Sequence, residues 1–173
     1  MQREPPAVSL SPGKLKNQQN AGHAICVPAD IDTDVVIAGR YLRTKDRSIW
    51  AVHVFEDLDP LLAPRLNGAV ILAGKNFGCG SSREQAAIAI REAGVVAVIA
   101  PSFARIFFRN AINIGLPLIE AEVPCTEGNL VRFSLEEGWV ETEGKRYGIR
   151  PLSPRMREIL AAGGLVNYWK AHQ

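Results

Sequence analysis

A strand–helix–strand pattern in the middle of the chain limits its fold more than any other feature. Residues 69–73 and 95–100 are continuous apolar runs, and a helical segment between them, 82–92, is ended by Gly94. Strands that are apolar on both faces are typical of parallel sheets, because helices or further strands cover each face. A parallel pair needs a crossover connection, which is right-handed in almost all proteins. The sequence therefore predicts an α/β domain.

Apolar segments on either side of this unit extend the predicted sheet. Short strands are expected at 24–27 and 116–119, and helices at 48–55 and 101–114. Helical periodicity places a set of apolar side chains on the faces turned toward the core. This set is Ile49, Val52 and Phe55 in the first helix, and Phe103, Ile106, Phe107 and Ile114 in the second.

The last third of the chain changes character. Segments 130–135, 139–143 and 145–149 are rich in β-forming residues and are separated by glycine turns, which predicts a small antiparallel meander. A closing helix at 153–162 begins with Ser153 as its cap and Pro154 at its first position. The predicted fold is a mostly parallel central sheet with flanking helices and an antiparallel C-terminal meander.

The length of 173 residues suits one domain with a sizeable core. Residues 1–20 are polar and contain prolines, so we interpret them as a flexible tail and 21–173 as the single domain. The tail has no apolar signal region, and no apolar run is long enough to span a membrane. The formal charge of +2 gives no electrostatic reason to expect nucleic acid as a partner.

The three cysteines, Cys26, Cys79 and Cys125, lie far apart in the sequence. They show none of the close spacings of zinc sites or iron–sulfur ligands, so we expect no metal bound by this chain. Their odd number, without a signal peptide, suggests a reducing cytoplasm. Spacing suggests no partner for the three histidines, which we interpret as structural or surface residues.

Residues 76–87, Asn-Phe-Gly-Cys-Gly-Ser-Ser-Arg-Glu-Gln-Ala-Ala, combine several features that bind anions. Gly78 and Gly80 allow a positive φ and a close approach of the backbone to a ligand. The following helix start presents unpaired amides and the positive end of its dipole. Arg83 can bind a carboxylate through two parallel hydrogen bonds. A carboxylate site at this turn is one interpretation.

The same residues also fit a purely structural role. Ser81 and Ser82 each precede an acceptor side chain, Glu84 or Gln85, by three residues, as in a helix capping box. A well-capped structural helix is therefore the alternative to an anion site. A phosphate-binding P-loop does not fit, because its Gly-Lys-Ser/Thr ending is missing. The Gly-x-Ser-x-Gly nucleophile elbow is absent as well.

Two further groups of charged residues are candidates for supporting roles. Asp32 and Asp34 lie in an acidic loop, where they can cap the next segment, with Asp34 as its expected cap, or buttress the turn by orienting Arg83. A metal site formed by these paired carboxylates is the alternative. Arg105 and Arg109 share one helix face, which we interpret as a solvated stripe rather than a second anion contact.

Three segments together resemble a known family: 30–34 with 39–42, then 76–84, then 102–107. In this order and spacing they are similar to the small subunit of 3-isopropylmalate dehydratase, which is homologous to the swivelling domain of aconitase. The resemblance extends from about residue 22 to residue 151. It implies a swivelling β/β/α domain and a cytoplasmic lyase subunit of leucine biosynthesis, which interconverts 2- and 3-isopropylmalate by dehydration and rehydration.

The resemblance also implies roles for individual residues. Ser81 would act as the catalytic base in its alkoxide form, while Gly80, Ser82 and Arg83 would bind the substrate carboxylate. Asp32, Asp34 and Glu84 would support this turn. The family's [4Fe-4S] cluster is held by the large subunit, so this chain would be active only with that partner.

Two positions leave the identity of the substrate undecided. Arg43 follows Tyr41-Leu42 in the segment that resembles the substrate-reading loop, and it can pair with an additional carboxylate. Gln85 stands where related sequences commonly have histidine. The small subunit of homoaconitase, or of another hydroxy-acid dehydratase, is therefore the runner-up. A module that binds a carboxylate or phosphate without turnover is an alternative of a different class.

Overall fold

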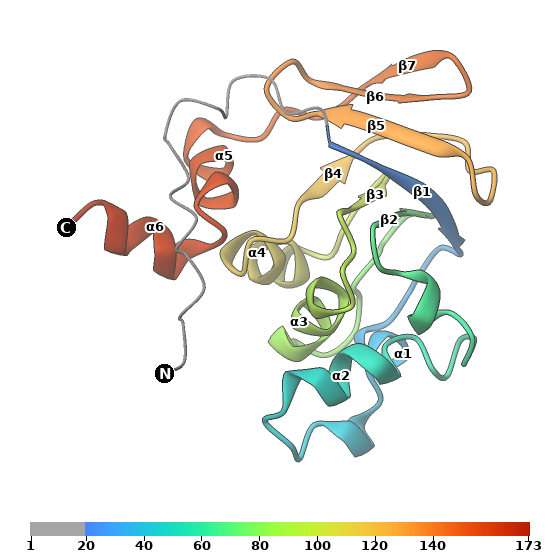
Figure 1. Cartoon of the computed structure of the whole chain (residues 1–173), viewed down its shortest axis with the longest axis vertical. Coiled ribbons are helices and arrows are strands. Elements are labelled where there is room, and N and C mark those ends of the chain that lie inside the picture. Colours follow the sequence, from blue (N-terminus) through green and yellow to red (C-terminus); the bar gives the residue numbers. More distant parts are fainter. Residues whose placement is uncertain (1–19) are drawn as a thin grey trace, which may run out of the picture.

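The computed structural model describes residues 20–173, which form one seven-stranded sheet with helices packed against it (Figure 1). The strand order is β4-β3-β2-β1-β5-β6-β7. The four parallel strands are β1 (Asn20–Val27), β2 (Ala69–Ala73), β3 (Ala97–Ala100) and β4 (Leu118–Glu120). The antiparallel strands are β5 (Leu130–Ser134), β6 (Trp139–Thr142) and β7 (Lys145–Gly148). The predicted parallel sheet and C-terminal meander are both confirmed.

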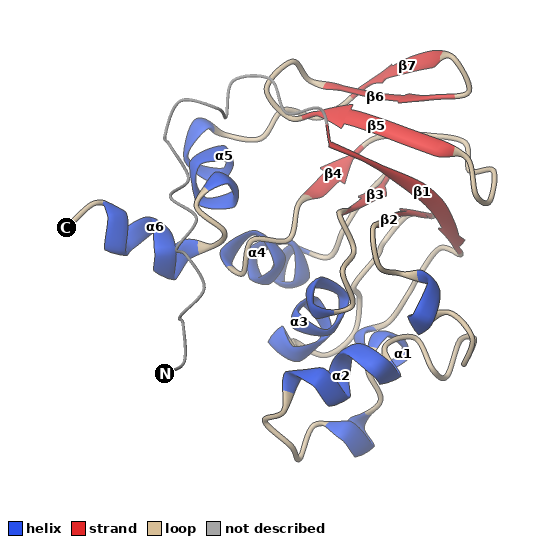
Figure 2. Cartoon of the chain, viewed as in Figure 1, coloured by secondary structure: helices blue, strands red, loops and turns tan. Residues whose placement is uncertain are grey.

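The helices lie together on one side of the parallel strands, away from the meander (Figure 2). They are α1 (Thr33–Val36), α2 (Arg47–His53), α3 (Glu84–Glu92), α4 (Arg105–Asn113), α5 (Pro154–Ala161) and α6 (Leu165–Ala171). Two short 3₁₀ helices, η2 (Gly39–Tyr41) and η3 (Ala63–Arg65), lie in the connections around α2.

Alternating side chains of the parallel strands contribute to two separate cores. Ile25, Ile71 and Val98 point toward the helices and join the larger core cluster. Their neighbours Val70 and Ile99 point the other way and join a cluster that includes side chains of β5 and β6. The sheet therefore curls so that its antiparallel part covers the second face of the parallel part. This β/β/α layering explains why β2 and β3 are apolar at every position.

The buried faces predicted for two helices were partly wrong. Val52 is 65% exposed and Ile106 is 54% exposed, although both were predicted to face the core. In α2 the buried side chain is Trp50. Phe55 is buried as predicted, but it lies beyond the end of α2, in a turn where its φ is +58°. Helices this short are held by a few tertiary contacts, which override the spacing of apolar residues.

The C-terminal region contains one helix more than the sequence predicted. Ser153 caps α5 as expected, since its hydroxyl accepts a hydrogen bond from the Met156 amide. After two glycines the chain turns into α6, and Tyr168 of α6 packs with Ile112 and Ile159. The predicted tail falls almost entirely on residues 1–19, outside the described part. Asn20 already belongs to β1.

Cys26 and Cys125 form a disulfide that the sequence did not predict. It joins β1 to the loop between β4 and β5, residues 121–129, and leaves Cys79 as the free thiol. Disulfides are rare in the reducing cytoplasm that the odd cysteine count suggested. Within residues 20–173, the structure contains no helix with the length and apolar character needed to cross a membrane.

Candidate functional site

The three sequence segments singled out above meet at the carboxyl end of β2. The turn that follows β2 forms an isolated β-bridge with the acidic loop, at Asp32 and Cys79, and another with the segment before α4, at Phe77 and Phe103. The Gly78 amide donates to the Ile31 carbonyl at 2.8 Å, within the same contact. Open α/β sheets place their ligands at this end of their strands. The fold therefore assembles one surface from 30–34, 76–83 and 102–107.

Glycine is required at both predicted positions of the turn. Gly78 has φ +84° and Gly80 has φ +86°, values that residues with a β-carbon rarely adopt. A β-carbon on Gly78 would lie 2.2 Å from the Phe107 ring. A β-carbon on Gly80 would lie 2.2 Å from an Asp32 carboxylate oxygen. The turn is thus pressed against both of its neighbouring segments.

The predicted capping role of the two serines was wrong. Helix α3 begins at Glu84, its cap position is Arg83, and no side chain caps it. Arg83 is extended, with φ −124° and ψ 106°, so Ser81 and Ser82 lie before the helix, and neither side chain accepts a hydrogen bond from its first amides. Both serines are exposed. Since no capping box forms with Glu84 or Gln85, the two exposed serines remain available to a ligand.

A cavity of about 400 Å³ opens beside these hydroxyls. Its lining residues come from all three segments: Thr33; Gly78 and Gly80 to Arg83; and Ala104 to Phe107. Arg105 contributes a second arginine to it, in addition to Arg83. The interpretation of Arg105 as part of a solvated stripe was therefore incomplete. The sequence signal that could have assigned it to the site is its place in the segment 102–107, one of the three segments that carry the family resemblance.

Arg83 is held in place by the acidic loop. Its Nη1 lies 2.6 Å from an Asp34 carboxylate oxygen and 3.5 Å from the Ile37 carbonyl, and its side chain is only 23% exposed. The expectation that Asp34 orients Arg83 agrees with this geometry. The cap of α1, however, is Asp32 and not Asp34, since Asp32 Oδ1 accepts from the Asp34 amide at 2.8 Å. Neither Asp32 nor Asp34 belongs to a group of three or more His, Cys, Asp or Glu side chains placed to hold a metal ion within the described residues.

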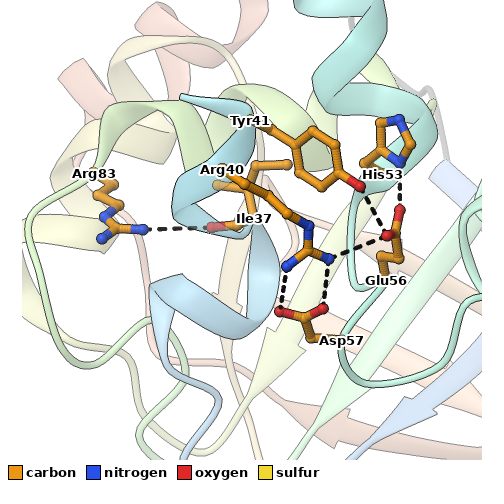
Figure 3. A network of polar contacts seen from close by, with 7 residues as sticks. All are labelled: Ile37, Arg40, Tyr41, His53, Glu56, Asp57 and Arg83. Atoms are coloured by element: carbon orange, nitrogen blue, oxygen red, sulfur yellow. Dashed lines mark hydrogen bonds and ion pairs between the residues drawn. The ribbon is translucent and has the colours of Figure 1, made fainter. Parts of the chain in front are cut away.

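A polar network holds η2, just beyond Arg83 (Figure 3). Arg40 binds both oxygens of Asp57, at 2.7 and 3.3 Å, and Glu56 at 3.1 Å. Tyr41 donates to Glu56 at 2.8 Å and stacks on His53, with ring centroids 4.0 Å apart. His53 also hydrogen-bonds Glu56, so this histidine has a partner that the sequence did not suggest.

These contacts shift the ionisation of the acidic groups. The hydrogen bond from His53, together with those from Tyr41 and Arg40, lowers the pKa of Glu56 to about 2. The bidentate contact with Arg40 lowers the pKa of Asp57 as well. A tightly held Tyr41 fixes the chain that leads into residues 42–46. This short loop carries Arg43, which is exposed and does not line the cavity.

The surroundings of the free thiol next to the serines disfavour its thiolate form. Burial, with a contribution from the Asp32 charge, raises the pKa of Cys79. Within residues 20–173 no group of three or more His, Cys, Asp or Glu side chains is placed to hold a metal ion. The donor set therefore does not fit an iron–sulfur cluster on the described part of this chain, because one free cysteine cannot ligate it.

Known proteins resemble this chain in both its curled sheet and its sequence. Residues 57–122 match the Aconitase C-terminal domain family. A solved structure of 3-isopropylmalate dehydratase (leuD) from Methanocaldococcus jannaschii superposes with a TM-score of 0.85 and 45% identity, and the match covers 90% of this chain and 95% of that one. The chain thus has the C-terminal, or swivel, domain of the aconitase superfamily.

Sequence relatives narrow the class further. A 3-isopropylmalate dehydratase small subunit from Aliarcobacter butzleri is 50% identical over 148 residues, which are 83% of this chain and 89% of the relative. A methanogen homoaconitase small subunit from Methanothermobacter thermautotrophicus is 51% identical over 143 residues, 81% of this chain and 84% of the relative. The chain belongs to the 3-isopropylmalate dehydratase small-subunit family, a lyase family to which the homoaconitase subunit is closely related.

Proposed function

We propose that this chain is the small subunit of a two-subunit hydro-lyase that isomerises 2- and 3-isopropylmalate by dehydration and rehydration, a step of leucine biosynthesis. One observation carries the proposal. Ser81 is exposed at a bend beside an arginine-lined cavity, with its hydroxyl committed to no capping role. A hydroxyl so placed can meet a substrate that a partner subunit delivers.

Ser81 is the proposed base, and its surroundings explain how it can work. Proton removal next to a carboxylate adds negative charge to the substrate, and cations and fixed dipoles stabilise that charge. Arg83 and Arg105 line the same cavity, and so do Gly80 and Ser82 of the turn that precedes α3. The same groups favour the Ser81 alkoxide over the neutral hydroxyl. Exclusion of water by a partner subunit strengthens each of these interactions.

Binding of the substrate carboxylate is assigned to Ser82, Arg83 and the Gly80 backbone. Arg83 is already fixed by Asp34, so it loses little side-chain entropy when a ligand arrives. Asp32 supports the turn by contact with Gly80. Glu84, at the first position of α3, is exposed, and its negative charge interacts favourably with the positive end of the helix dipole.

Membership of this family supports a large-subunit partner that carries the cofactor. The large subunit would hold the [4Fe-4S] cluster, which supplies a Lewis acid for the substrate hydroxyl and carboxylate. This chain supplies the basic hydroxyl and the anion-binding turn. We place the complex in the cytoplasm, in keeping with a biosynthetic lyase; the Cys26–Cys125 bond is the observation that speaks against this compartment.

A homoaconitase subunit is the second candidate, and Arg43 favours it. Its guanidinium is exposed on the loop after η2 and forms no ion pair within residues 20–173. It is therefore available to a third carboxylate, such as the one that distinguishes homoaconitate from isopropylmalate. The homoaconitase relative at 51% identity agrees with this alternative.

The test is an anaerobic reconstitution with the cognate large subunit. Isopropylmalate, citraconate, homoaconitate and aconitate are offered in parallel, and turnover is measured for each. Ser81→Ala should lower kcat about 10²–10⁴-fold, the contribution of a general base, while complex formation stays intact. Ser82→Ala should act mainly on KM.

Two results would contradict the proposal. Retention of most of the rate by Ser81→Ala would exclude the alkoxide role. Binding of carboxylates by the isolated chain, combined with no stable complex and no turnover, would favour the non-catalytic binding module.

A further inference from the structure

A second and larger cavity, of about 680 Å³, lies between α4 and α5. Its inner wall is apolar, and three of its side chains, Ile112, Leu152 and Ile159, are buried. Phe103, Phe108 and Met156 are partly buried and complete this wall. The volume falls within the range of sites that hold small organic ligands.

The rim of this cavity is strongly cationic. It carries four arginines (Arg105, Arg109, Arg150 and Arg155) and one acidic residue, Glu120. Arg150 and Glu120 neutralise one another in an ion pair at 3.1 Å. The other three arginines form no ion pair within residues 20–173. The rim therefore has a local net charge of +3, which exceeds the +2 of the whole chain.

The beginning of α5 adds to this field. Ser153, Arg155 and Met156 line the cavity, so the positive end of an eight-residue helix opens onto it. Three unpaired guanidinium groups close together repel each other unless an anion is present between them. Guanidinium forks match carboxylate and phosphate groups in a bidentate manner.

We propose that this cavity binds a small aliphatic oxyanion, with its carboxylate or phosphate head among Arg105, Arg109 and Arg155 and its tail on the apolar wall. The site lies beside the serine turn but is separate from it, since Arg105 is the one side chain that lines both cavities. A ligand that draws Arg105 toward this cavity would remove a cation from the cavity of Ser81. Through this shared arginine, occupancy would then be coupled to the proposed active site.

Matched eight-carbon probes can test the site on the full-length chain. Octanoate and octyl phosphate carry the required head, whereas octylamine and 1-octanol share the tail but have a cationic or neutral head. NMR titration of methyl-labelled protein should show saturable shifts at Ile112, Leu152 and Met156 with the two anions only. The stronger of the two anions identifies the head group.

Substitutions separate this site from a nonspecific attraction of anions. The double variant Arg109→Ala/Arg155→Ala should weaken octanoate binding at least tenfold. The control double variant Arg47→Ala/Arg132→Ala removes the same charge from exposed arginines elsewhere and should bind as the wild type does. Met156→Trp should fill part of the cavity and also abolish binding.

Several results would overturn the proposal. These are equal binding of octanol and octanoate, equal loss of binding in both double variants, or shifts confined to the cavity of Ser81. The large subunit provides a further arm. Two results together would show that the cavity is a docking surface for an acidic segment of the partner and not a ligand site. The large subunit would displace octanoate, and Arg109→Ala/Arg155→Ala would weaken the association of the two subunits. Because the titration needs no turnover, its outcome is independent of the proposed catalytic function.

Discussion

Gly80→Ala is the substitution that best tests the geometry of the serine turn, and Gly138→Ala is its matched control. The two glycines have nearly the same φ, +86° and +80°. They differ in their surroundings. A β-carbon on Gly80 would lie 2.2–2.6 Å from the carboxylate atoms of Asp32, whereas one on Gly138 would meet no atom within 4 Å.

The structure gives the expected size of both effects. A β-carbon in the left-handed region costs about 1–2 kcal/mol, and stiffening of the unfolded chain offsets about 0.4–1 kcal/mol of this. Gly138→Ala should therefore lower the free energy of unfolding by about 1 kcal/mol. Gly80→Ala must also displace Asp32, which then loses its cap bond to Asp34, a further cost of about 1 kcal/mol or more.

Thermal unfolding of the isolated chain measures the difference. For a chain of this size, Gly138→Ala should lower Tm by about 2–4 °C and Gly80→Ala by about 4–10 °C. The reconstituted enzyme gives a second measurement, in which Gly80→Ala should lose most turnover and Gly138→Ala almost none. Equal Tm values for the two variants would refute the close packing of Asp32 against the turn.

Three further predictions concern other parts of the chain. Arg43→Val should lower kcat/KM for tricarboxylates about tenfold or more relative to isopropylmalate, whereas Lys45→Val on the same loop should leave the ratio unchanged; steady-state kinetics measure both. The pKa of Glu56 is lowered from 4.5 to about 2, so its contribution to stability is present above pH 4.5 and is lost as the pH falls toward 2. Glu56→Gln should remove that part of the pH dependence in denaturant titrations at pH 7 and pH 3. Reduction of the Cys26–Cys125 disulfide, which spans 99 residues, should lower the free energy of unfolding by about 2–4 kcal/mol, and Cys125→Ser should make the protein insensitive to the reductant.

The parallel strands were predictable from sequence because a strand buried on both faces is apolar at every position. Residues 69–73 and 97–100 are apolar at every position, and the structure shows a different core on each side of them. The meander was visible for a related reason, since its strands alternate and its turns contain glycine. Both signals are local and need no knowledge of distant contacts.

Features that depend on distant contacts were not predictable in the same way. The start of α3 moved to Glu84 because the serines belong to a turn fastened to 30–34 and 102–104, not to the helix. Val52 became exposed because the buried residue of α2 is Trp50, whose indole donates to the Tyr41 carbonyl. The Cys26–Cys125 pair could not be read from spacing, because the sheet brings these residues together.

The turn is held in a way that keeps the hydroxyl of the proposed base, Ser81, free of structural contacts within residues 20–173. The Thr33 hydroxyl, itself buried, donates to the Ser81 carbonyl at 2.8 Å, and the Thr33 amide donates to the Cys79 carbonyl at 2.9 Å. Gly78 is fixed through its amide and Gly80 through its contact with Asp32. Each of these contacts uses backbone groups of the turn. A capped helix would have fixed the same serine through its hydroxyl, and that oxygen would then be unavailable to a substrate.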